Sequence, residues 1–304
     1  MSLDALALGA TLYLPATRPD LAAILLGGRI PGLRSAVICL EDAVAEADLP
    51  VALRNLAAFL RTLPPRPEAG RAPLPFVRPR DAAMLARILR MPGADRLAGF
   101  VLPKANADNV PAWLALPLLP DHWLMPTLET REMFDPAEVR RLREQLLVVQ
   151  DRILALRIGG NDLLQLLGCR RSLSLTCYDG PLGALIAALV GAFAPWGFAL
   201  SAPVMERFDD PALLREEVAR DLDHGLLTKT VIHPAQIAVV HAALAVSSSE
   251  VAQARAILAG GSPAVFASGG TMCEPATHRG WARTLIRRAE LFGIADPLPL
   301  AREA

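Results

Sequence analysis

Residues 123–162 read WLMPTLETREMFDPAEVRRLREQLLVVQDRILALRIGGND, which is two apolar runs joined by a polar stretch of helix-forming composition. The first run ends at Glu129, and the second leads through two glycines to Asp162. Between them, Asp135 followed by proline is typical of a helix N-cap with proline in the first turn. Strand, helix and strand in this order predict one unit of a parallel α/β fold, in which functional residues follow the carboxyl ends of the strands.

The same alternation runs along the whole chain. Each short apolar run ends at charged or polar side chains and is followed by a stretch rich in Ala, Leu, Arg and Glu. We expect strands at residues 11–16, 35–40, 76–79, 100–103, 123–128, 153–158, 198–202 and 229–232. Eight such units predict a (β/α)₈ TIM barrel over residues 1–248, with a C-terminal helical extension or lid at 249–304.

Composition argues against several classes of protein. The 31 basic and 31 acidic residues give a formal net charge of zero, which predicts no general attraction to nucleic acid or to anionic membranes. No uninterrupted apolar stretch is long enough to span a bilayer, and Asp4 interrupts the N-terminal region, so we expect no membrane association and no signal peptide. The four cysteines lack metal-binding spacing, and a cytoplasmic enzyme is the expected class.

Glu129 and Asp162 form the strongest candidate pair. They follow neighbouring predicted strands, which lie about 4.8 Å apart in a sheet, so their carboxylates can meet at the barrel mouth. Protein-bound Mg²⁺ is usually held by one or two carboxylates together with water and substrate oxygens. The pair therefore predicts a Mg²⁺ site. The alternative is that Glu129 supplies a helix N-terminal charge and Asp162 caps the next helix.

Three arginines are candidates for binding an anionic substrate. Arg78 and Arg80 flank a proline at the end of a predicted strand, and alternation directs both to the same side. A guanidinium can hold a carboxylate through two hydrogen bonds or stabilise an enolate oxygen. Arg18 follows the first predicted strand in the same way. The alternatives are an ion pair of the first two arginines with Glu41 or Asp42, and a helix charge for Arg18.

Lys104 and Glu206 also follow predicted strands. A lysine in this position can form a Schiff base if its pKa is lowered, but beside a metal pair a charge-pairing role is the favoured interpretation. Glu206 is expected either to contact the substrate or to cap the following helix.

The C-terminal region is expected to complete the active site, in its own chain or in a partner subunit. Residues 267–271 are small and glycine-rich enough to act as a flexible hinge before a helix predicted at 275–292. Glu274, His278 and Trp281 recur at helical spacing and would share one face of that helix. The alternative is that the helix packs on its own barrel, with Glu274 as its N-cap.

Seven of these segments form an ordered set of short motifs. They are LYLPATRPD (12–20), CLEDAV (39–44), FVRPR (76–80), VLPK (101–104), PTLET (126–130), IGGNDL (158–163) and TVIHPAQI (230–237). Together, over residues 11–245 and on to the terminal helix, they resemble the HpcH/HpaI aldolase and citrate lyase β-subunit superfamily. With the tail at 272–282, the chain is similar to the C–C bond lyase-like branch encoded with bacterial tellurite-resistance and stress-response gene clusters.

The resemblance implies site residues and a reaction. It implies Mg²⁺ bound by Glu129 and Asp162. It also implies an enolate-stabilising or carboxylate-binding role for Arg78 and substrate contacts from Arg18 and Glu41. Members of the family cleave or form a bond next to a carbonyl, commonly on acyl-CoA or 2-oxo acid substrates, and a homo-oligomer, a trimer or hexamer, is expected.

Three motifs depart from the pattern of this family. Cys39 stands where the family has the first residue of Asp-Leu-Glu-Asp, and Gly-Gly-Asn-Asp at 159–162 replaces Gly-Thr-Ala-Asp. Glu274 takes the place of a lid aspartate, which malyl-CoA-type relatives donate to a neighbouring site as an acid. The longer side chain changes the reach of that acid by one methylene.

We therefore expect a Mg²⁺-dependent carbon–carbon lyase or aldolase that acts on a 2-oxo acid, hydroxy acid or acyl-CoA substrate through an enolate. The expected catalytic residues are Arg78, Glu41 and Glu274. The expected substrate-binding residues are Arg18, Arg80, Lys104 and Glu206. Two alternatives stay open: a catalytically silent barrel that binds a metabolite or a partner protein of a stress-response operon, and a Schiff-base aldolase that uses Lys104.

Overall fold

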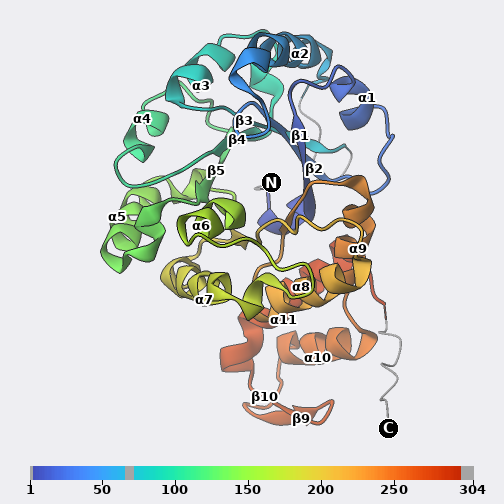
Figure 1. The fold of residues 1–304 in the computed structure, drawn as a ribbon. Coiled ribbons are helices and arrows are strands. Elements are labelled where there is room, and N and C mark those ends of the chain that lie inside the picture. Colours follow the sequence, from blue (N-terminus) through green and yellow to red (C-terminus); the bar gives the residue numbers. More distant parts are fainter. Residues whose placement is uncertain (1–2, 66–71, 296–304) are drawn as a thin grey trace. The chain divides into compact units, whose positions relative to one another are not determined.

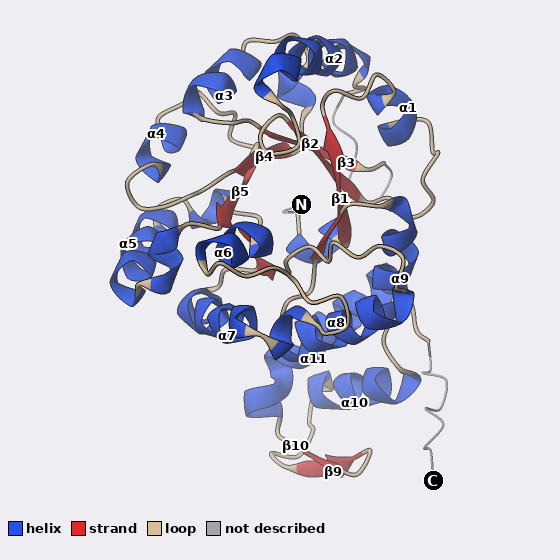
Figure 2. Ribbon diagram, in the orientation of Figure 1, coloured by secondary structure: helices blue, strands red, loops and turns tan. Residues whose placement is uncertain are grey.

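The computed structural model of the chain describes residues 3–65 and 72–295 and contains eight parallel strands arranged as a barrel (Figure 1, Figure 2). The strands are β1 (Ala10–Pro15), β2 (Ser35–Cys39), β3 (Leu74–Arg78), β4 (Gly99–Leu102), β5 (Trp123–Leu128), β6 (Leu156–Ile158), β7 (Leu200–Ser201) and β8 (Lys229–Val231). Neighbouring strands follow the order β7-β6-β5-β4-β3-β2-β1-β8, and a bridge between Ala202 and Lys229 joins the two ends. The predicted (β/α)₈ barrel is confirmed.

Helices lie outside the strands and form the outer layer of the barrel in Figure 2. They are α1 (Leu21–Leu25), α2 (Leu49–Thr62), α3 (Ala82–Ile88), α4 (Val110–Leu114), α5 (Pro136–Leu147), α6 (Gly160–Leu166), α7 (Pro181–Phe193), α8 (Pro211–Asp223) and α9 (Pro234–Leu244). α5 begins as predicted, because the Asp135 carboxylate accepts a hydrogen bond from the amide of Ala137 and Pro136 occupies the first turn. Within the described ranges, no helix combines the length and apolar composition needed to cross a membrane.

Two strands are shorter than the sequence predicts. β6 begins at Leu156, although Ile153 still forms a parallel bridge with Leu124. β7 contains only Leu200 and Ser201, although Ala202 still forms a parallel bridge with Lys229. The other predicted strands agree with the structure to within two residues at either end.

The interior of the barrel is apolar near the amino ends of the strands and polar near their carboxyl ends. Nine buried residues, which we call the apolar plug, fill the interior near the amino ends of the strands. They are Leu8, Val37, Leu74, Phe76, Ala98, Val101, Met125, Leu154 and Ala155. Side chains alternate along a strand, so a residue two positions after a plug residue points into the same interior, one step closer to the mouth. In β5, Met125 is followed in this way by Thr127. In β6, Arg157 follows Ala155.

The chain divides into two compact units, Met1–Val240 and His241–Ala304, and the division falls within α9. The second unit contains α10 (Ser248–Leu258), β9 (Phe266–Ser268), β10 (Thr271–Cys273) and α11 (Pro275–Phe292). Its own buried core consists of Val246, Val251, Ala254, Ile257, Cys273, Ala282 and Leu285. The domain boundary expected after residue 248 stays a prediction, and residues 296–304 of the expected extension lie outside the described residues.

The segment expected to be a flexible hinge, 267–271, is instead part of a hairpin. β9 and β10 pair antiparallel, and Gly269 and Gly270 between them have positive φ angles of 59° and 77°. Positive φ at both central residues is the geometry of a two-residue type I′ turn, which glycine adopts without steric cost. The glycine pair therefore closes a tight turn rather than providing a hinge.

Candidate active site

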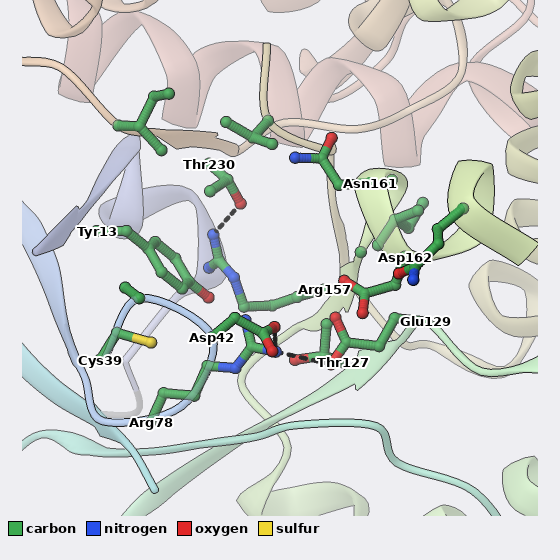
Figure 3. A pocket seen from close by; sticks show the side chains of 17 residues that line it. Tyr13, Cys39, Asp42, Arg78, Thr127, Glu129, Arg157, Asn161, Asp162 and Thr230 are labelled. Carbon is green, nitrogen blue, oxygen red and sulfur yellow. Dashed lines mark hydrogen bonds and ion pairs between the residues drawn. The ribbon is translucent and has the colours of Figure 1, made fainter. Parts of the chain in front are cut away.

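A cavity of about 470 Å³ lies where the strands of the first unit end (Figure 3). This volume is in the range of sites for small molecules. The polar side chains and the cysteine that line it are Tyr13, Cys39, Asp42, Arg78, Thr127, Glu129, Arg157, Asn161, Asp162, Gln165 and Thr230. Active sites of TIM barrels lie at this carboxyl-terminal face, so the cavity is the candidate active site.

Arg78, the last residue of β3, is the centre of the charged part of the cavity. Its Nη2 lies 2.7 Å from Glu41 Oε2, 2.9 Å from Glu129 Oε1 and 3.2 Å from Asp42 Oδ2. The residue is only 8 % exposed, and its Nε has no hydrogen-bond partner among the described residues. The carboxylates fix the guanidinium in place, while the unpaired Nε is a donor that a ligand could satisfy.

Glu129 follows β5 and is 3 % exposed. Its Oε1 accepts hydrogen bonds from the backbone amide of Lys104 at 2.7 Å and from Arg78 at 2.9 Å. Its Oε2 lies against Gly159, where even a single Cβ would overlap the carboxylate. Gly159 has an ordinary φ of −86°, so space rather than backbone conformation requires glycine there. Asp162, in the first turn of α6, brings its carboxylate beside that of Glu129 (Figure 3).

The surroundings of these carboxylates change their protonation. Burial raises the pKa of Glu129 to about 7, with Arg78 opposing the rise and Asp162 adding to it. Burial also raises the pKa of Glu41, against the opposing charges of Arg78 and Lys104. An added cation near Glu129 would favour its ionised form.

Glu129 and Asp162 fit a divalent cation that prefers oxygen ligands. Their carboxylates turn toward one another and form an incomplete shell, which suits Mg²⁺ because that ion retains water and accepts substrate oxygens. In the part of the chain that the structure describes, no group of three or more His, Cys, Asp or Glu side chains is arranged to hold a metal. The two predicted ligands thus lie together, and their binding of a metal stays a prediction.

Lys104 belongs to the same charged group. Its Nζ pairs with Glu41 and lies 3.2 Å from Asp42 Oδ1 and 3.8 Å from Asp162 Oδ1. Burial alone would lower the pKa of Lys104, but these carboxylates outweigh that effect and hold the pKa above its ordinary value. A Schiff-base lysine needs the opposite environment, so charge pairing is the role that this geometry supports.

None of the four predicted substrate-binding residues lines the cavity, although Lys104 pairs with carboxylates that do. Arg18 forms an exposed ion pair with Asp20 at 2.8 Å. Arg80 donates to two backbone carbonyl oxygens of the loop after β2 and pairs with a glutamate of that loop. Alternation does not apply to Arg80, because β3 ends two residues earlier. Glu206 accepts a hydrogen bond from the cavity residue Asn161 at 3.0 Å.

Glu274 precedes α11 in the second unit. Among the described residues its side chain makes no capping hydrogen bond, and its backbone amide donates instead to His278 Nδ1 at 3.1 Å. The role of Glu274 as a catalytic acid stays a prediction.

The deepest polar residues of the cavity were not predicted from the sequence. We call Tyr13, Thr127, Arg157 and Thr230 the cavity floor. Arg157 is 1 % exposed and donates to the Thr230 hydroxyl at 2.6 Å. An arginine in the middle of an apolar run is a signal that could have found this site, because a buried charge needs a partner. Tyr13 and Thr230 carry no comparable signal.

Comparisons with known proteins agree with this architecture. A family model described as C-C_Bond_Lyase of the TIM-Barrel fold matches residues 2–294. A curated (3S)-malyl-CoA thioesterase from Cereibacter sphaeroides (strain KD131 / KCTC 12085) is 27 % identical to this chain over 226 residues. The match covers 70 % of this chain and 69 % of that protein.

Solved structures are similar over most of the chain. The CitE protein of Mycobacterium tuberculosis in complex with magnesium, acetoacetate and coenzyme A is 27 % identical, with a TM-score of 0.69 over 94 % of this chain and 99 % of that chain. The citrate lyase beta subunit of M. tuberculosis complexed with oxaloacetate and magnesium is 26 % identical, with a TM-score of 0.59 over 79 % and 99 %. RipC from Yersinia pestis, at 22 % identity and a TM-score of 0.60 over 82 % and 100 %, shares the fold.

Proposed function

The chain belongs to the C–C bond lyase family of the TIM-barrel fold, and we propose that it is a Mg²⁺-dependent carbon–carbon lyase or aldolase that acts on a 2-oxo acid, hydroxy acid or acyl-CoA. The observation that carries the proposal is the pair Glu129 and Asp162, whose carboxylates meet beside Arg78 in a cavity of small-molecule size. Two similar proteins were solved with magnesium together with acetoacetate or oxaloacetate, which supports this metal and this class of substrate.

The residues around the pair have distinct tasks in this proposal. Mg²⁺ held by Glu129 and Asp162 would supply Lewis-acid polarisation of a substrate oxygen. Arg78 presents positive charge where negative charge develops as the carbon–carbon bond breaks. Glu41 holds Arg78 at 2.7 Å and keeps it oriented before substrate arrives.

Protonation of the enolate needs an acid, for which Glu41 and Glu274 are the candidates. Glu41 lies in the charged group itself, where burial raises the pKa of its carboxyl against the charges of Arg78 and Lys104. Glu274 would act from the second unit, as its place in the family motif implies. Single Glu→Gln variants of the two residues separate these possibilities.

Two alternative functions would use the cavity differently. A Schiff-base aldolase would use Lys104, whose Nζ is held by carboxylates that favour its charged form. A catalytically silent barrel would bind a metabolite without converting it. The similarity to a (3S)-malyl-CoA thioesterase makes thioester hydrolysis a further reaction to measure.

The test is a turnover assay with a panel of 2-oxo acids, hydroxy acids and CoA esters, in Mg²⁺ or in EDTA, with products identified by mass spectrometry. We expect carbon–carbon cleavage by the wild type in Mg²⁺ and its loss in EDTA, in Glu129→Gln and in Asp162→Asn. Cleavage that persists in EDTA and is trapped on Lys104 by borohydride would establish the Schiff-base mechanism instead. Binding without turnover of any compound would establish the silent barrel.

A further inference from the structure

Arg157 carries a positive charge into the deepest polar part of the cavity. It lies in β6, and its Nη1 is 3.7 Å from the sulfur of Met125 in the apolar plug. The strand register pairs Thr127 with Arg157, and Glu129 follows Thr127 by two residues. Since a strand rises about 3.3 Å per residue, the backbone of Arg157 lies about 6.6 Å farther from the mouth than that of Glu129, measured along the strand direction.

The acceptors around Arg157 are few and weak. Nη2 donates to the Thr230 hydroxyl at 2.6 Å, a thioether sulfur is a poor acceptor for Nη1, and the buried Nε has no partner in the described ranges. The face of the Tyr13 ring lies 5.3 Å from the guanidinium carbon. No carboxylate of residues 3–65 and 72–295 forms an ion pair with Arg157, so its charge is not neutralised by the protein at close range.

Other arginines with an unpaired Nε are placed differently. Arg143 and Arg152 each donate a guanidinium N–H to a backbone carbonyl oxygen at 2.9 Å, and neither lines the cavity. Arg78 is held by three carboxylates. Of these four arginines, Arg157 is the one with neither a carboxylate nor a carbonyl acceptor.

A buried charge above an apolar plug destabilises the fold unless something pairs with it. Arg157 lines a cavity that can hold a small molecule, so a ligand can supply the missing partner. A guanidinium pairs best with a carboxylate, through two parallel hydrogen bonds. Figure 3 shows Arg157 beside Tyr13 and Thr230 on one side of the cavity, with Glu129 and Asp162 on the other.

We propose that the cavity floor is a second anion subsite, in which Arg157, supported by Tyr13 and Thr230, binds a carboxylate of the substrate remote from the metal end. The proposal rests on the function proposed above and narrows its substrate to a small dicarboxylic 2-oxo or hydroxy acid, free or as a portion of a larger substrate. A substrate with a single carboxylate, placed at the metal end, leaves Arg157 unpaired.

Binding of two matched acids tests this subsite without any need for turnover. Malate and 2-hydroxybutanoate have the same number of carbons, but malate has a carboxylate where 2-hydroxybutanoate has a methyl group. Calorimetry with both enantiomers of each acid, in Mg²⁺ and in EDTA, would compare the wild type with Arg157→Met and Thr230→Val. Arg143→Met is the control, because it removes a guanidinium that also has an unpaired Nε but lies outside the cavity.

We expect the wild type and Arg143→Met to bind malate about 10- to 100-fold more tightly than 2-hydroxybutanoate, as a charge-assisted pair implies. Arg157→Met should bind the two acids about equally, with an unchanged affinity for 2-hydroxybutanoate and a thermal midpoint at least as high as that of the wild type. Thr230→Val keeps the charge and should reduce the preference only in part, so the subsite remains testable if Arg157→Met fails to fold.

The outcomes separate the two proposals. A wild type without preference for malate, or an Arg157→Met variant that weakens both acids equally, would overturn the subsite while Mg²⁺-dependent binding still supported the proposed function. A preference for malate that depends on Arg157 in EDTA as well as in Mg²⁺, with no effect of Glu129→Gln, would support the subsite and overturn the metal-dependent function.

Discussion

The first unit contains two groups of charged side chains, and they differ in how completely they are paired. We call one the closed network: Arg171, Tyr178, Glu217, Asp221 and Lys229. Lys229 Nζ lies 2.9 Å from both Glu217 Oε1 and Asp221 Oδ2, and the Tyr178 hydroxyl donates to Asp221 Oδ1 at 2.6 Å. Arg171 pairs with Glu217. In the described ranges none of these side chains has a buried polar atom without a partner.

The other group lies at the cavity and is incompletely paired, and all of its members except Glu41 and Lys104 line the cavity. It consists of the cavity floor and the mouth cluster, which is Glu41, Asp42, Arg78, Lys104, Glu129 and Asp162. Here Arg78 Nε, Arg157 Nε and Thr127 Oγ1 are buried without partners among the described residues. Complete pairing is what stability requires, whereas unpaired donors beside a cavity indicate an arrangement suited to a ligand.

The largest effect is expected in the closed network. Lys229→Met should lower the free energy of unfolding by about 3–5 kcal/mol, because it leaves Asp221 buried without a cation and leaves Glu217 with Arg171 alone. Chemical denaturation measures the loss, and Arg54→Met on the exposed surface of α2 should change stability little. A Lys229→Met variant as stable as the wild type would show that the network is not structural.

Substitutions in the mouth cluster should lower activity rather than stability. Arg78→Lys keeps the charge but loses the planar guanidinium, so we expect kcat/KM to fall by about 10²–10³-fold with the fold retained. Steady-state kinetics and thermal unfolding on the same preparation check both statements, with exposed Arg87→Lys in α3 as the control. A large loss of stability with normal turnover would show instead that Arg78 stabilises the fold and takes no part in the reaction.

A smaller effect is expected from the glycine behind the metal pair. Gly159→Ala adds a Cβ that overlaps the Glu129 carboxylate, so that carboxylate must move and Mg²⁺ affinity should fall about 10- to 100-fold. Gly191→Ala in α7, where a Cβ meets no atom within 4 Å, is the matched control. Equal Mg²⁺ affinity of both variants in calorimetry would contradict the placement of the metal at Glu129.

The smallest effect is a dependence of Mg²⁺ affinity on pH. Burial raises the pKa of Glu129 to about 7, and a protonated carboxyl must lose its proton before it can bind the metal. Affinity should therefore rise about tenfold per pH unit below pH 7 and level off above it. Calorimetric titrations on either side of neutrality measure this slope, and an affinity independent of pH there would remove Glu129 from the ligand set.

Much of the barrel could be predicted from the sequence. β5 and α11 begin and end at the predicted residues, because an apolar run and a proline-led helix are strong local signals. Charges that follow strands gather at one face of a barrel, which brought Glu129, Asp162 and Lys104 together as predicted. The family match confirms the resemblance to the HpcH/HpaI and citrate lyase β superfamily and to its C–C bond lyase-like branch, whereas the association with tellurite-resistance gene clusters and the homo-oligomer stay predictions.

The missed features depend on contacts between distant parts of the chain. Arg157 meets Thr230 and Tyr13 only because barrel closure brings β8 and β1 to within two and three strands of β6, which no local pattern encodes. The predicted orientation of Arg80 was wrong, because it assumed a strand alternation that stops where β3 ends. Arg18 lies beside Asp20, whose charge satisfies it locally. Local patterns thus predict which strand ends are polar, and tertiary packing decides which of the side chains face the cavity.

The central claim, that the incompletely paired group is a binding site, is tested most directly by a crystal structure of the protein with Mg²⁺ and malate. We predict one oxygen each of Glu129 and Asp162 at about 2.0–2.1 Å from the metal. The same structure should show the malate carboxylate remote from the metal paired with Arg157. A metal bound elsewhere, or Glu129 and Asp162 without metal at saturating Mg²⁺, would contradict the account.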